Sequence, residues 1–174
     1  MIEIMNDAHL HMVVNHFPII GTILGLGILI AGMVLKKISV KNTAYYLFVV
    51  AAVFAAFSMG TGEGAEELVE DMPSVGKQII HEHEEMAENF AVVMYVLGFC
   101  SLLGIYFDYK NHVKAKLVAA IVLVIAMVSV VFGSLVGNSG GEIRHTEIRA
   151  NAVPAGAAEQ NTAVGEQGET EDKD

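Results

Sequence analysis

The stretch that decides the fold is His9-Leu10-His11-Met12-Val13-Val14-Asn15-His16-Phe17-Pro18, which leads directly into the apolar segment 19–35. Three histidines, an asparagine and a proline stand here, where a hydrophobic helix enters a membrane. A polar group at that depth is costly unless it is paired or bound to something. We therefore expect this stretch to carry a function, with the rest of the chain supplying its partners.

Long apolar runs alternate with short charged stretches along the 174 residues, and 53% of the residues are hydrophobic. That pattern is typical of a membrane protein. A helix needs about 20 residues to cross a hydrocarbon core of about 30 Å. The candidate spans are 12–35, 44–61, 86–107 and 117–137. The sequence thus predicts an all-α fold, a four-helix transmembrane bundle formed by residues 1–149, whose first helix is retained in the mature protein.

The distribution of lysine predicts the orientation of the bundle. The loops 36–43 and 108–116 each carry three lysines, whereas the segment 62–85 has one lysine against eight carboxylates. By the positive-inside rule both lysine-rich loops are cytoplasmic, so both termini lie outside. Six of the seven histidines and nearly all of the acidic residues behind the net charge of −10 then lie on the outer side. This charge argues against a nucleic-acid partner.

Two helix ends are marked by proline and glycine. Either the first helix begins at Pro18 and 9–14 is a separate interfacial segment, or a continuous helix from His9 is kinked at Pro18. Gly60, Gly62 and Gly64 predict that the second helix ends at the outer face. Residues 65–72 are then expected to form a short amphipathic helix in the outer loop. Residues 150–174 have little to bury and are predicted to be a disordered acidic tail.

Histidines from three helices are expected to converge at the outer side. His81 and His83 point in nearly opposite directions on a helix, and His83 shares its face with apolar residues. His83 is therefore the candidate that faces the bundle. A haem or metal site needs ligands from separate elements, because one helix cannot surround an ion or clamp both faces of a porphyrin. The candidate ligands are His11, His16, His83 and His145.

Small residues recur every four positions on the fourth helix, at Ser129, Gly133, Gly137 and Gly141. One interpretation is close packing against another helix. The other is a flat groove that receives a planar cofactor such as haem. Both interpretations stay open at the level of sequence.

Four blocks of this sequence resemble the signature blocks of a bacterial family of predicted membrane proteins, catalogued as domain of unknown function 2231. They are His11-Met12-Val13-Val14-Asn15-His16-Phe17-Pro18-Ile19, Thr61-Gly62-Glu63-Gly64-Ala65-Glu66-Glu67, His83-Glu84-Glu85-Met86-Ala87 and Gly140-Gly141-Glu142-Ile143-Arg144-His145. The resemblance runs through all four helices. It implies four spans in the bacterial inner membrane with histidines at one face. Members fused to Rieske or cytochrome-type domains imply a redox role and haem b.

Three functional interpretations follow, and the first is a cytochrome. Paired neutral imidazoles would ligate one or two haems b, with His16 and His83, or His11 and His145, as the first pairs to test. The protein would then pass electrons between the quinone pool or a respiratory complex and a periplasmic carrier.

The other two interpretations need no haem. In one, the histidines and Glu63, Glu66 or Glu85 hold a zinc, copper or iron ion. In the other, the histidines only stabilise the outer cap of a non-redox subunit, whose small-residue stripes bind a larger complex or a second copy in a homo-oligomer. The sequence contains no nucleophile-and-base arrangement, phosphate loop or nicotinamide fingerprint, so an electron-transfer or accessory subunit is expected rather than a stand-alone enzyme.

Overall fold

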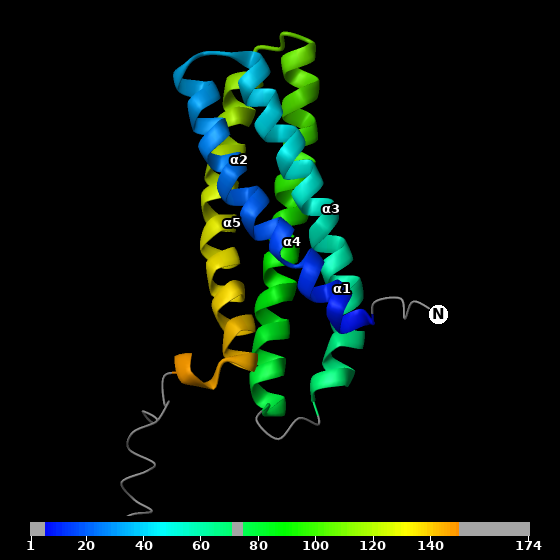
Figure 1. Cartoon of the computed structure of the whole chain (residues 1–174). Helices are drawn as coiled ribbons and strands as arrows, with labels where there is room; N and C mark the ends of the chain where they lie inside the picture. Colours follow the sequence, from blue (N-terminus) through cyan, green and yellow to red (C-terminus); the bar gives the residue numbers. More distant parts are fainter. Residues whose placement is uncertain (1–5, 71–74, 150–174) are drawn as a thin grey trace, which may run out of the picture.

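The long apolar runs of the sequence form helices that pack side by side (Figure 1). The computed structural model describes residues 6–70 and 75–149. Within these residues there is no strand, which confirms the predicted all-α fold. The elements are α1 (Asp7–Val14), α2 (His16–Val34), α3 (Ile38–Val69), α4 (Lys77–Tyr109), α5 (Ala115–Arg144) and a 3₁₀ helix, η1 (Thr146–Ile148).

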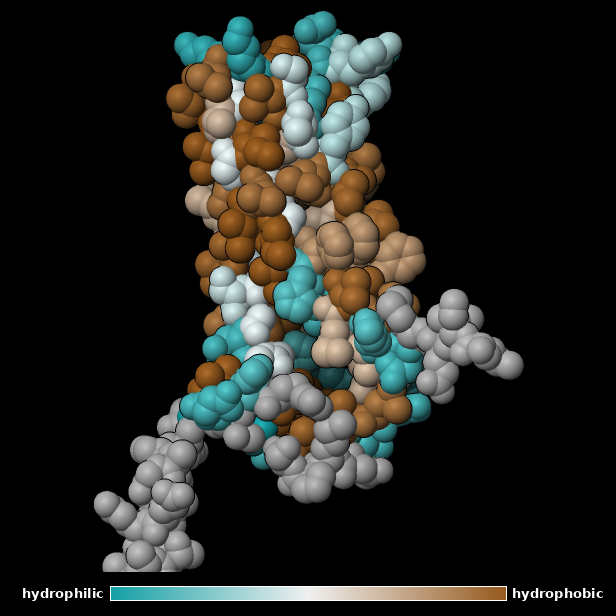
Figure 2. Space-filling view, in the orientation of Figure 1, coloured by the Kyte–Doolittle hydropathy of each residue, from teal (hydrophilic) through white to brown (hydrophobic). Residues whose placement is uncertain are grey.

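Four helical segments are long and apolar enough to cross a membrane: α1 with α2, then α3, α4 and α5. Figure 2 shows an apolar band with hydrophilic residues at both ends of the bundle. At a rise of about 1.5 Å per residue, α4 is about 50 Å long, and it therefore extends well beyond a hydrocarbon core of about 30 Å. The observed helices exceed the predicted spans because hydropathy detects only the apolar middle of each helix.

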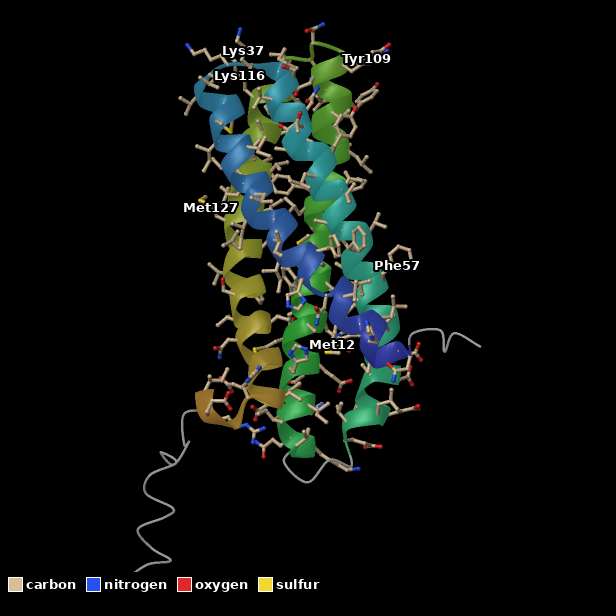
Figure 3. All side chains as sticks on the ribbon, in the orientation of Figure 1. Met12, Lys37, Phe57, Tyr109, Lys116 and Met127 are labelled. Atoms are coloured by element: carbon tan, nitrogen blue, oxygen red, sulfur yellow. The ribbon has the colours of Figure 1, made fainter. Side chains whose placement is uncertain are left out.

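The four long helices form a closed ring in which α2 packs on α3, α3 on α4, α4 on α5 and α5 on α2. Two short connections, α2 to α3 and α4 to α5, lie at one end, where Figure 3 shows Lys37, Lys116 and Tyr109. We call this the lysine-rich end. The opposite end, which carries α1 and η1, is the histidine end. The core between them is built from large buried side chains: Leu29, Tyr45, Phe48, Met94, Leu97 and Val122.

Pro18 explains the break between α1 and α2. A proline has no backbone N–H to donate, and its ring collides with the carbonyl group four residues earlier, which is that of Val14. α1 ends at Val14, and α2 starts at His16 with Pro18 buried in its first turn, where the missing donor is not needed. α1 then packs chiefly on α3 (Figure 1). Residues 9–14 are thus a separate segment, and the new helix begins two residues before Pro18.

The predicted break of the second helix at Gly60, Gly62 and Gly64 is wrong, because α3 continues without interruption to Val69. Glycine in a helix costs about 1 kcal/mol relative to alanine, but here it lets α1 approach. A Cβ added at Gly64 would lie 2.8 Å from the Cβ of Asp7, and one at Gly62 would lie 3.8 Å from His11 Cε1. The expected amphipathic helix is therefore the last part of α3. The tail 150–174 lies outside the described residues.

Candidate functional site

His11 is held in one tautomer by α3. Its Nδ1 lies 3.1 Å from the carbonyl oxygen of Ser58 and 3.2 Å from Oγ1 of Thr61. The Thr61 hydroxyl donates its own proton to a backbone carbonyl, that of Phe57 or Ser58, so both neighbours of the imidazole are acceptors. We therefore assign the proton of His11 to Nδ1. Its Nε2 is left with a free lone pair.

The same arrangement recurs at His83, on α4. Its Nδ1 lies 2.8 Å from Oγ of Ser139 on α5, and that hydroxyl donates to the carbonyl of Val136 at 3.0 Å. Nδ1 of His83 is thus also the donor, and Nε2 again has a free lone pair. The missing side chain of Gly140 leaves room for the His83 ring, because a Cβ there would lie 3.0 Å from Cε1 of the imidazole.

The structure brings His11 and His83 together at the histidine end. Both side chains are partly buried, and the two rings are close enough to interact electrostatically. His16 interacts in the same way with His11, but its side chain is exposed and its Nδ1 lies 3.0 Å from the carbonyl of Met12. A neutral imidazole oriented through Nδ1, with Nε2 free, is the form in which histidine binds a metal. The histidine end presents two rings oriented in this way by a neighbouring helix, His11 and His83.

His145 stands apart from this group. It caps the C-terminus of α5 with its side chain 63% exposed, and its Nδ1 lies 2.9 Å from Oε1 of Glu147. A hydrogen bond from its own backbone N–H and a second from His145 lower the pKa of Glu147. In the part of the chain that the structure describes, no interaction links His145 with the other candidate histidines.

The candidate carboxylates have other partners or face solvent. Glu63 is exposed, and Glu85, 68% exposed, lies 3.8 Å from Nε2 of His81. Glu66 lies beside Glu84, where the end of α3 meets α4. Across residues 6–70 and 75–149, no three or more His, Cys, Asp or Glu side chains are arranged to hold an ion.

The small-residue stripe of α5 packs against other side chains. A Cβ added at Gly133 would lie 3.3 Å from the Phe90 ring, and one at Gly137 would lie 3.5 Å from Ile19. At Gly141 the corresponding neighbour is Ile148, at 3.3 Å. Side chains from α2, α4 and η1 thus cover the stripe. These contacts support the helix-packing interpretation of this face.

Sequence reasoning missed the hydroxyl groups that orient the two rings: Thr61 for His11 and Ser139 for His83. Ser58 and Thr61 are three residues apart and so share one face of α3, which was a detectable signal. Ser139 gave none, because its pairing with His83 spans 56 residues and depends on how α4 packs on α5.

Residues 8–147 match the model of a family described as Predicted membrane protein (DUF2231). No curated protein and no solved structure matches the chain.

Proposed function

The chain belongs to the DUF2231 family of predicted membrane proteins, and from that premise we propose that it is a membrane-embedded, b-type cytochrome-like electron-transfer protein in which His11 and His83 would hold haem b. The observation that carries the proposal is the matched orientation of these two imidazoles, each held through Nδ1 by a helix other than its own. Haem b, when bound, supplies one-electron chemistry at its iron.

The number of ligands favours haem over a bare ion. An ion held by protein alone usually needs three or four side-chain ligands, whereas haem brings four equatorial nitrogens and needs two axial ligands. His11 and His83 supply two imidazoles from different helices, and no cluster of three or more ligands occurs in the described residues. The donor set therefore fits haem b, which His11 and His83 would hold. Ser139 and Thr61 would hold the rings in place during electron transfer.

The proposed location follows from charge. The lysine-rich end would face the cytoplasm of a bacterium by the positive-inside rule, and the histidine end would face the periplasm. In this orientation the protein would exchange electrons between the quinone pool or a respiratory complex in the inner membrane and a periplasmic carrier.

Two alternatives have a specific observation behind them. His16, next to His11, would provide a third imidazole for a zinc, copper or iron ion. The filled small-residue stripe instead favours a non-redox subunit whose histidines stabilise the packing of its helices.

An optical spectrum of the detergent-purified protein, oxidised and then dithionite-reduced, separates these functions when elemental analysis is done on the same sample. A sharp reduced α-band that disappears in His11→Ala and in His83→Ala is the expected result. His81→Ala is the matched control, since His81 is 71% exposed and lies two residues from His83. A colourless protein with stoichiometric metal would overturn the haem proposal in favour of an ion site. A protein with neither haem nor metal would favour the non-redox structural subunit.

A further inference from the structure

A second polar cluster lies at the lysine-rich end, far along the bundle from the histidines. Lys41 in the first turn of α3 and Asp108 in the last turn of α4 form an ion pair, with Nζ 2.8 Å from Oδ1. Their side chains are only 12% and 3% exposed. The two charges neutralise each other inside the bundle.

Two further oxygen atoms of this cluster have no hydrogen-bond partner among the described residues. They are Oδ2 of Asp108 and the hydroxyl of Tyr45. Tyr45 is fully buried and close enough to Asp108 to interact with it electrostatically. Its ring packs on Gly104, where an added Cβ would lie 2.7 Å from Cε2, and Gly104 is one helical turn before Asp108. A buried polar atom without a partner is destabilising.

The chemistry of these atoms restricts what can bind between them. The tyrosine hydroxyl offers a proton, and the carboxylate oxygen accepts one, so the ligand must both accept and donate. Lys41 disfavours a cation and Asp108 disfavours an anion, so the ligand is neutral. Water is the smallest molecule that meets these conditions, and buried waters in proteins typically make about three hydrogen bonds.

We propose that Tyr45 and Asp108 hold an internal water molecule between α3 and α4 beside the Lys41 ion pair. The water accepts from the Tyr45 hydroxyl and donates to Oδ2 of Asp108. Oδ1 of Asn42, three residues before Tyr45 and on the same side of α3, also has no partner within residues 6–70 and 75–149, and it accepts the second hydrogen of the water.

Thermal unfolding of Tyr45→Phe tests the proposal through the sign of the change in Tm. If the hydroxyl binds water, removing it leaves the buried water with one hydrogen bond fewer, and Tm falls. If the hydroxyl is unpartnered, Phe removes a buried polar group without loss, Tm rises, and the proposal is overturned. Tyr46→Phe is the matched control, because Tyr46 is the next residue and 59% exposed. Its Tm should stay at the wild-type value.

A rotation of Tyr45 that lets it donate directly to Asp108 would also lower Tm in Tyr45→Phe, and NMR distinguishes the two cases. With ¹³C-labelled tyrosine, a bound water gives a cross peak between the water protons and the Tyr45 ring protons. The cross-relaxation rate of that peak shows whether the water is long-lived at this position. Absence of that cross peak in the wild-type protein would overturn the proposal.

Discussion

His83 on α4 donates a 2.8 Å hydrogen bond to the hydroxyl of Ser139 on α5, and this bond fixes which imidazole nitrogen is free. The hydroxyl can accept because its own proton goes to the carbonyl of Val136. Histidines at metal sites are commonly oriented in this way. The hydrogen-bond partner of the nitrogen that does not bind the metal then makes the other nitrogen a stronger ligand.

Ser139→Ala should weaken both the fold and the proposed site. It leaves the Nδ1–H of His83 without its acceptor, which we expect to lower the free energy of unfolding by about 1–3 kcal/mol. Loss of such an orienting partner reduces cofactor or metal affinity by about 10–100-fold. Ser134→Ala is the control, because Ser134 is exposed and bonds only to its own helix, at the carbonyl of Val130. Equal behaviour of the two variants in unfolding and in haem titration would contradict the assigned role.

Gly32→Ala should destabilise the contact of α2 with the start of α3. A Cβ at Gly32 would lie 2.6 Å from the backbone nitrogen of Lys41, which cannot move without shifting α3. We expect a loss of about 1–3 kcal/mol, the usual effect of overpacking. Gly27→Ala in the same helix has nothing within 4 Å and should gain up to about 1 kcal/mol from helix propensity. Denaturant unfolding in detergent would compare them, and a stabilised Gly32→Ala would show that this contact is not close.

Asp108→Ala should be strongly destabilising, because it leaves the ammonium group of Lys41 buried without its counter-charge. The expected loss is about 3–5 kcal/mol, whereas replacing both partners, as in Lys41→Met with Asp108→Leu, should restore most of it. The control is Glu70→Gln, at the more exposed ion pair with Lys77, which should change stability by about 0–1 kcal/mol. A double variant as unstable as Asp108→Ala would rule out the unpaired charge as the cause.

Glu147 should titrate below the ordinary glutamate pKa of 4.5, because its own backbone N–H and His145 hydrogen-bond to it. A pKa lowered by folding means that the carboxylate stabilises the folded state above the ordinary value and that this contribution is lost as pH falls through the folded-state value. Carboxyl ¹³C NMR of the native chain and of His145→Ala measures the effect. The midpoint should rise in His145→Ala, and an unchanged midpoint would show that His145 does not contribute.

The four membrane-spanning segments and their helical type were readable from the sequence, because a span has one dominant requirement, a long apolar run. The prediction that His83, and not His81, faces the bundle was also correct, because His83 bonds to Ser139 of α5 whereas His81 is 71% exposed. This difference was predictable because residues two apart point to nearly opposite faces of a helix. The course of α3 through Gly60, Gly62 and Gly64 was not predictable in this way. Those glycines are compatible with a helix because α1 covers two of them, and that contact joins residues about 50 positions apart.

The pairing within the site was beyond sequence reasoning for the same reason. Which histidine lies next to His83 depends on the direction in which α1 leaves α2 at Asn15, a local turn that redirects His11 toward α3. The pairs suggested first, His16 with His83 and His11 with His145, did not follow from spacing, because the sequence left the start of the first helix open. The structure instead separates His145 and groups His11 with His83.

The separation of α1 from the ring of four long helices gives the two halves of the histidine pair different local stabilities. His83 belongs to a helix packed on both sides, whereas His11 belongs to an eight-residue helix that rests chiefly on α3. Short peripheral elements open with lower free energies than the core of a fold. Detachment of α1 would therefore take His11 away from His83 while the bundle stays folded, and amide hydrogens of α1 would exchange with solvent before those of α4. Loading and release of anything held by the pair would then require unfolding of only these eight residues.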